Sequence, residues 1–159
     1  MNALAYFLLA GLATLFTSLR IKNERQKYRR YKQRMAMDVN ILFQESTDPY
    51  DHMRRGSVML RLHKCDNDIK GIVIKEVSFN ESEFYVPTFD NLYFKRNNDK
   101  SQLLSASFRI RRHSLRRLTG KQLHITISGW ISENDGKTKL FKTRIPYLVQ
   151  HDEKHATVE

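Results

Sequence analysis

The first nineteen residues carry no charged side chain, and this feature constrains the chain more than any other. Leucine and phenylalanine recur so often in the run that a helix built from it is apolar on every face. The large apolar residues are Leu4, Phe7, Leu8, Leu9, Leu12, Leu15, Phe16 and Leu19. Such a helix is roughly 28 Å long, close to the thickness of a bilayer's hydrocarbon core. The run therefore predicts a transmembrane anchor over residues 1–21.

Two alternatives compete with an uncleaved anchor. A secretory signal peptide needs a basic segment before the apolar run and small residues at a cleavage site after it. This sequence has no basic residue before Arg20, and the apolar run ends in Thr17, Ser18 and Leu19. A buried helix of a soluble domain is the other alternative. The length and the flanks of the run favour the anchor over both.

A dense basic block follows the apolar run. Residues 20–34 hold eight Lys and Arg side chains against the single acidic residue Glu24. Because basic residues beside a membrane span stay on the cytoplasmic side, we expect a single-pass membrane protein whose C-terminal domain faces the cytoplasm. The lone Cys65 fits a reducing compartment. The block also offers candidate contacts to anionic lipid, for which we select Arg25, Lys27, Arg29 and Arg30.

The chain after the anchor lacks both Pro and Gly until residue 49. Apolar residues recur there at helical spacing, which predicts a basic amphipathic juxtamembrane helix over residues 22–43. The residues on this stripe are Tyr28, Tyr31, Met35, Val39 and Leu42. Residues 44–56 are polar and include Pro49, so we expect a linker there.

From residue 57 the apolar period changes from helical to two, and this predicts an all-β domain over residues 57–149. The pattern suggests about seven antiparallel strands arranged as a sandwich or a small barrel. The expected strands cover residues 58–63, 69–79, 84–86, 92–94, 106–111, 123–131 and 138 onward. Cys65 to Asp68 predicts one hairpin turn, and Asp135-Gly136 predicts another. Residues 150–159 are expected to be a disordered tail.

A second basic cluster lies inside the expected β domain. The 159-residue chain has a formal net charge of +11, and much of its excess charge lies in this cluster and in residues 20–34. The second cluster comprises Arg109, Arg111, Arg112, Arg116, Arg117 and Lys121, with no acidic residue between them. Arginine presents a planar fork of donors that suits phosphate groups, but charge runs more often form a solvated or lipid-facing surface, and this second interpretation is favoured.

The sequence offers no catalytic signature. It has no glycine-rich phosphate loop, no serine elbow and no pair of catalytic carboxylates. His151 and His155 have the spacing of a zinc-binding helix, but Asp152 occupies the place of the general-base glutamate and no third ligand is in view. His63 and Cys65 give only two ligands. We therefore predict no enzymatic activity, no catalytic residues, no cofactor and no metal site.

These features favour a membrane-anchored scaffold or adaptor that holds a protein partner at the membrane. Trp130 shares a strand face with His124 and Thr126, where it serves either as a partner anchor or in a second packed layer. The alternative is a membrane-tethered receptor that binds an anionic ligand through the Arg109–Lys121 cluster. The expected partners are membrane lipid and a protein, and a nucleotide or nucleic acid is the less favoured partner.

Overall fold

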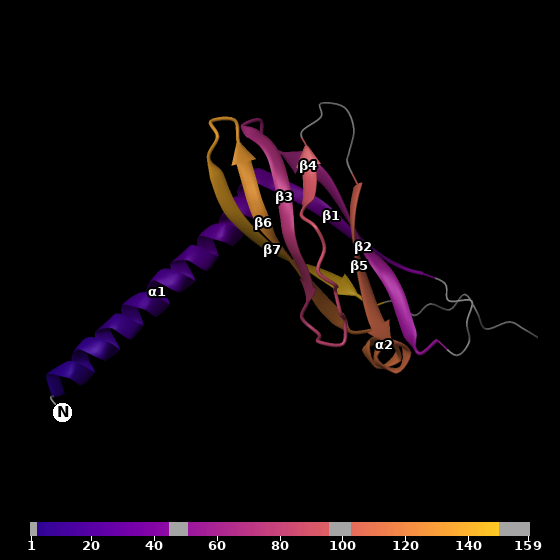
Figure 1. Ribbon diagram of the computed structural model, residues 1–159, viewed down its shortest axis with the longest axis horizontal. Coiled ribbons are helices and arrows are strands. Elements are labelled where there is room, and N and C mark those ends of the chain that lie inside the picture. The colour runs from indigo at the N-terminus through magenta and orange to yellow at the C-terminus, as the bar shows by residue number, and fades with distance from the viewer. Residues whose placement is uncertain (1–2, 45–50, 96–102, 150–159) are drawn as a thin grey trace, which may run out of the picture.

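A long N-terminal helix leads into a two-sheet β domain (Figure 1). A computed structural model describes residues 3–44, 51–95 and 103–149 of the chain. The helices are α1 (Ala3–Arg34) and α2 (Arg112–Leu118). The strands are β1 (Met35–Phe43), β2 (Met53–Cys65), β3 (Ile69–Phe79), β4 (Leu92–Lys95), β5 (Leu103–Arg111), β6 (Gln122–Glu133) and β7 (Thr138–Leu148).

The strands form two antiparallel sheets that share one core. Sheet A has the strand order β1-β2-β5, and sheet B has the order β4-β3-β6-β7. The prediction of about seven antiparallel strands is confirmed for the described residues. Side chains alternate along β6, where Leu123, Ile125 and Ile127 point inward and are buried. Buried residues of both sheets join in a single hydrophobic cluster, so the two sheets stabilise each other.

Two glycines let the strands of sheet B meet as they do. Gly136 has a φ of 82°, the left-handed conformation that the tight turn between β6 and β7 requires, so the second predicted hairpin is confirmed. Gly129 in β6 lies against the backbone carbonyl of Val73 in β3, and a Cβ atom there would collide with it. A larger residue at position 129 would therefore separate the two central strands of the sheet.

The expected amphipathic helix over residues 22–43 is wrong for its second half. The helix ends at Arg34 and the chain continues directly as β1. Helical spacing at Met35, Val39 and Leu42 suggested the helix, but Met35, Met37 and Ile41 are buried at a spacing of two and four residues. Alternation about every second residue fits a strand better, because β1 pairs with β2 along nine positions.

Other boundaries also differ from expectation. Strand β2 begins at Met53, so the last part of the expected 44–56 linker belongs to the sheet, and residues 45–50 lie outside the described residues. The turn after Cys65 is present, but it carries the chain from sheet A to sheet B instead of closing a hairpin. The expected strand at 84–86 is a single bridge from Tyr85 to Arg109. The expected tail at 150–159 also lies outside the described residues.

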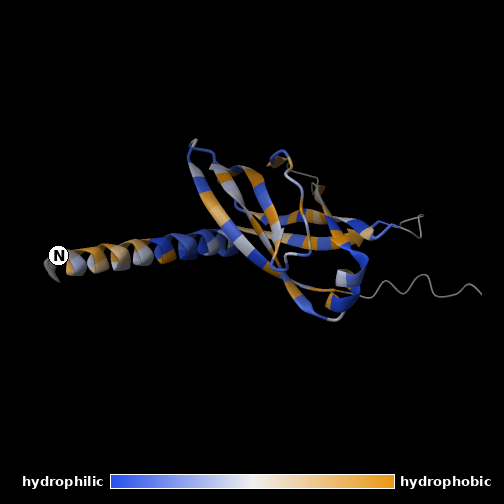
Figure 2. Cartoon of the chain, turned by 60° about the horizontal axis from the view of Figure 1, so that its bottom comes forward, coloured by the Kyte–Doolittle hydropathy of each residue, from blue (hydrophilic) through white to orange (hydrophobic). Residues whose placement is uncertain are grey.

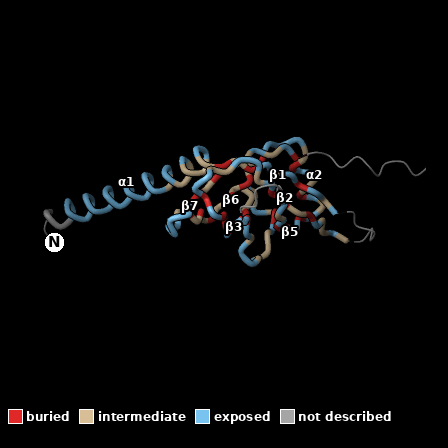
Figure 3. The backbone as a smooth tube through the Cα atoms, turned by 90° about the horizontal axis from the view of Figure 1, so that it is seen from above, coloured by how far each residue is buried: buried red, intermediate tan, exposed pale blue. Residues whose placement is uncertain are grey.

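Helix α1 projects away from the β domain as one continuous element (Figures 1 and 3). Its N-terminal half is apolar and its C-terminal half is polar, as the colours of Figure 2 show. The apolar half is exposed: Phe7 retains 80% and Phe16 74% of its accessible surface. Within the described part of the chain, no helix has both the length and the apolar content of a membrane-spanning segment.

Candidate functional site

The last turns of α1 pack against β7 and begin the site region at one end of the domain. The Tyr31 ring stacks on Phe141, with 6.2 Å between ring centroids. The Tyr31 hydroxyl accepts a hydrogen bond of 3.0 Å from the backbone N–H of Met37. The Arg30 guanidinium donates to the carbonyl of Leu140 at 3.0 Å. Because β7 is an edge strand, this contact also covers a carbonyl that would otherwise be open to pairing.

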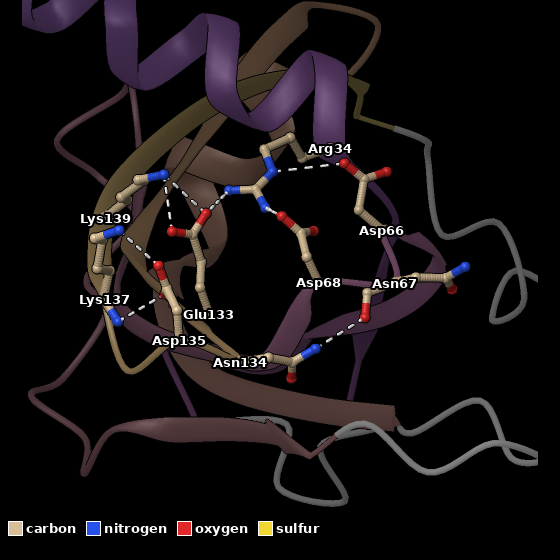
Figure 4. A network of polar contacts seen from close by, with 9 residues as sticks. All are labelled: Arg34, Asp66, Asn67, Asp68, Glu133, Asn134, Asp135, Lys137 and Lys139. Carbon is tan, nitrogen blue, oxygen red and sulfur yellow. Dashed lines mark hydrogen bonds and ion pairs between the residues drawn. The ribbon is translucent and has the colours of Figure 1, made fainter.

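An ion cluster fixes the junction of helix and sheets, and it is drawn in Figure 4. Arg34, the last residue of α1, pairs with Asp68 in the turn before β3 and with Glu133 at the end of β6. Its Nε atom lies 3.5 Å from Asp66. Lys139 adds a second cation to Glu133 at 2.8 Å. The cluster therefore ties α1, the turn between the sheets and the β6–β7 hairpin together.

The pKa values in the cluster shift as mutual ion pairing dictates. Hydrogen bonds from Lys139 and Arg34 hold the pKa of Glu133 below its usual value. Arg34 likewise lowers the pKa of Asp68. Desolvation alone would lower the pKa of Arg34, but its bonds to Asp68 and Glu133 outweigh this, so the pKa is raised. All of these groups are charged near neutral pH, and each charge is paired with one of opposite sign.

The structure divides the four α1 cations that sequence analysis selected for lipid contact. Arg25 and Arg29 are exposed. Lys27 and Arg30 are half-buried, and Lys27 pairs with Glu24 of the same helix at 2.6 Å. Glu24 in turn lies 3.3 Å from Lys142 of β7. Two of the four cations are therefore free to meet an anionic surface, and two are already engaged within the molecule.

The second basic cluster is also divided by the fold. Arg109 and Arg111 are exposed on the outer face of β5, and Arg112 and Arg116 follow in α2. Arg117 pairs with Glu83 instead of facing the others. The remaining predicted member, Lys121, is exposed beyond the end of α2. Three of the six predicted residues line a common hollow, whose lining residues are His52, Met53, Arg111, Arg112, His113 and Arg116.

Trp130 lies on the outer face of sheet B, as its strand alternation predicted. It is half-buried and stands in register with Val73 of β3 and Leu140 of β7. Val73 is in turn paired with Tyr93 of β4. Leu140 keeps 50% and Tyr93 46% of its accessible surface. An apolar row, formed by Tyr93, Val73, Trp130 and Leu140, therefore crosses all four strands of sheet B on the side away from the core.

Sequence analysis missed several members of these surfaces. The Trp130–Leu140 pair follows from the Asp135-Gly136 turn, since counting back along both strands from that turn sets the register. No comparable local signal brings Arg55 opposite Arg109, because the two residues are far apart in the chain. His52 lies in the expected linker over residues 44–56, so the sequence did not indicate it as a site residue.

Metal sites were not expected, and the described part of the chain contains no group of three or more metal-binding side chains. His63 lies 3.2 Å from Asp38 across the first strand pair. His151 and His155 lie outside the described residues. The absence of a cofactor and of catalytic residues stays a prediction. In comparisons with known proteins, no family model, no curated protein and no solved structure matches this chain.

Proposed function

We propose that this protein is a membrane-attached, non-enzymatic adaptor. The uncharged N-terminal end of α1 embeds in a membrane, the β domain stands on the cytoplasmic side, and the apolar row of sheet B holds a protein partner. The observation that carries the proposal is the run of exposed large apolar side chains on α1. They are Tyr6, Phe7, Leu8, Leu9, Leu12, Leu15, Phe16 and Leu19.

Exposure of this kind favours a lipid environment. Each of these side chains keeps more than half of its accessible surface, and together they surround the helix. A soluble protein rarely exposes a continuous apolar surface of this size, because covering it releases about 25 cal/mol for each Å². Lipid chains cover a helix on all sides, whereas a docked protein covers one stripe. The membrane is therefore the covering we propose.

The basic half of α1 supports the orientation. Arg20 and Lys22 follow the apolar run at once, and Arg25 and Arg29 remain exposed beside them. Cations at this position hold the adjoining domain on the cytoplasmic side and interact with anionic headgroups. Since α1 continues without a break into its packing against β7, the same helix both enters the membrane and carries the domain.

The apolar row on sheet B supports the adaptor role. Trp130 and Tyr93 are residue types that dominate the binding energy of protein interfaces. Leu140 adds an exposed aliphatic side chain next to Trp130. The sequence carries no catalytic motif that would make the surface an enzyme's substrate site.

Membrane attachment and orientation are tested together by cysteine labelling of intact cells. The Cys65→Ser background removes the native thiol. A cysteine introduced by Lys70→Cys on the exposed side of β3 should react with an impermeant maleimide only after the cells are opened. One introduced by Asn2→Cys should react without opening them. Labelling of Lys70→Cys in intact cells would overturn the orientation, and release of the protein by alkaline carbonate would overturn membrane embedding.

The adaptor role is tested by purification of the full chain in mild detergent. We expect a protein partner whose recovery falls in Trp130→Ser and in Leu140→Ser. Met59→Ser is the matched control, because Met59 lies on the outer face of the other sheet. The melting temperature of each variant shows whether it folds. A partner retained by both sheet B variants, or lost equally from the control, would contradict the proposed surface.

A further inference from the structure

The hollow at the end of sheet A joins three segments of the domain. Its volume is about 510 Å³, within the range of small-molecule sites. His52 comes from the segment before β2, Arg111 ends β5, and Arg116 lies in α2. The backbone N–H of Arg112 donates to the carbonyl of His52 at 3.0 Å. Met53 is the register partner of Arg111. The lining is therefore assembled by the fold and does not depend on one flexible loop.

Positive charge is concentrated around the hollow, and this arrangement does not stabilise the fold. Arg55 of β2 stands directly opposite Arg109 of β5, two register positions from the Met53–Arg111 pair that lines the hollow. Like charges facing each other across two strands destabilise a sheet. Within the described residues, none of Arg55, Arg109, Arg111 and Arg116 forms an ion pair with a carboxylate.

Two other arginines of the molecule are paired with carboxylates. Arg34 contacts three carboxylates, and Arg117, next to Arg116 in the same helix, contacts Glu83. The exposed arginines around the hollow thus differ from their neighbours by lacking an internal counter-charge among the described residues. A group of cations that repel each other and are not neutralised internally is suited to an external anion.

We propose that this hollow binds a soluble ligand that carries at least two linked phosphate groups, such as a nucleoside diphosphate or triphosphate. Guanidinium groups bind phosphate oxygens through two parallel hydrogen bonds, and Arg111 and Arg116 offer two such forks. The imidazoles of His52 and His113 add further N–H donors. The Met53 side chain supplies an apolar wall for a base or sugar.

The location of the hollow favours a soluble ligand over a lipid headgroup. In Figures 1 and 3, α2 lies on the side of the β domain away from the free end of α1. The basic part of α1, Arg20 to Arg34, adds about 20 Å of helix between the apolar run and the domain. That length exceeds the screening distance of about 8–10 Å at physiological salt.

The test is isothermal titration of the full chain, in detergent micelles and low salt, with ATP and with pyrophosphate. We expect both to bind, with affinity that falls as salt is raised. Arg111→Ser combined with Arg116→Ser should weaken binding by about tenfold or more, because two charge-assisted contacts are lost. The combination of Arg61→Ser with Arg144→Ser is the matched control, since it removes the same charge from exposed positions elsewhere on the two sheets.

A second variant keeps the proposal testable if the serine variant does not fold. Arg111→Lys combined with Arg116→Lys preserves charge but removes the bidentate fork, so binding should weaken while the melting temperature is unchanged. Failure of the wild-type chain to bind either compound would overturn the proposal. An equal loss in the control would show that only net charge matters, which also overturns it. Binding to vesicles of anionic phospholipid, lost in the serine variant, with none to ATP or pyrophosphate would assign the hollow to lipid and overturn it.

Discussion

Arginine side chains occur in two different settings in this domain: Arg34 is paired with carboxylates, whereas Arg111 and Arg116 around the hollow are not, within the described residues. Arg34 is 15% exposed and touches Asp66, Asp68 and Glu133. Arg111 and Arg116 are exposed and pair with no carboxylate in the described parts of the chain. The first arrangement ties three segments together, whereas the second leaves charge available. The comparison teaches that the number of arginines in a cluster says little about its role until their counter-charges are known.

The largest effect that would sharpen this comparison is expected for Arg34→Met. The substitution keeps the length of the side chain but leaves Glu133 and Asp68 without their shared cation. We expect the free energy of unfolding to fall by about 2 kcal/mol, since a partly buried charge network loses its centre. Urea unfolding of the full chain in detergent at pH 7 measures this loss. A change of under about 0.5 kcal/mol would show that the cluster is not structural.

The same cluster predicts a dependence on pH. The pKa values of Glu133 and Asp68 are lowered in the folded chain, so the unfolded chain takes up protons first as the solution is acidified. Their contribution to stability is therefore complete above their usual values of 4.5 and 3.8 and is lost as the pH falls further.

Unfolding curves at pH 7, 5, 4 and 3 should thus show the gap between wild type and Arg34→Met closing below about pH 4.5. The same pair of curves is measured in a Glu133→Gln background, which removes one of the two titrating carboxylates. There the stability difference caused by Arg34→Met should decrease less as the pH falls. A gap that stays constant with pH would contradict the assigned pairing.

Arg111→Met combined with Arg116→Met should change stability far less than Arg34→Met. Both side chains are exposed and no carboxylate pairs with them among the described residues, so we expect a change within about 0.5 kcal/mol. The same urea experiment measures it. A loss as large as that of Arg34→Met would remove the contrast between the two clusters.

The smallest effect is expected for Arg55→Ser. Removing one of two facing arginines relieves the repulsion with Arg109, and the free energy of unfolding should rise by a few tenths of a kcal/mol. Arg61→Ser, on the same strand face but opposite Leu103, should give no such gain. A difference of this size is best measured as a shift of the urea midpoint at low and at high salt, since salt should abolish it.

The contrast between the clusters could not have been predicted from the sequence, although much of the fold could. Strands β5, β6 and β7 follow from strict alternation and from the turn at Gly136, which are local signals. Strand β1 was mistaken for helix because Met35 and Val39 satisfy the helical spacing as well as the strand spacing. Lys and Arg before it are strong helix formers, and the true helix ends only at Arg34.

The pairing of strands was the harder part to predict. The turn after Cys65 looked like a hairpin, but a turn specifies only that the chain reverses and not which sheet receives it. The partners of Arg34 come from the turn before β3 and from the end of β6, and the neighbours of Arg111 in the hollow come from residues 52–53 and from α2. Each depends on contacts between distant segments, so arginines that look alike in the sequence acquire different partners.

The unbroken passage from α1 into β1 has a consequence for how the domain faces its surroundings. No loop separates Arg34 from Met35, and the cluster at Arg34 clamps the joint. Each residue of an α-helix turns the chain by about 100° around the helix axis. The direction in which the Trp130 face points around the axis of α1 is therefore set by the number of helical residues between the apolar end of α1 and Arg34. Insertion of one residue in α1 would rotate the β domain around the helix axis by about 100°. Insertion of three or four residues, close to one full helical turn, would restore most of the original orientation.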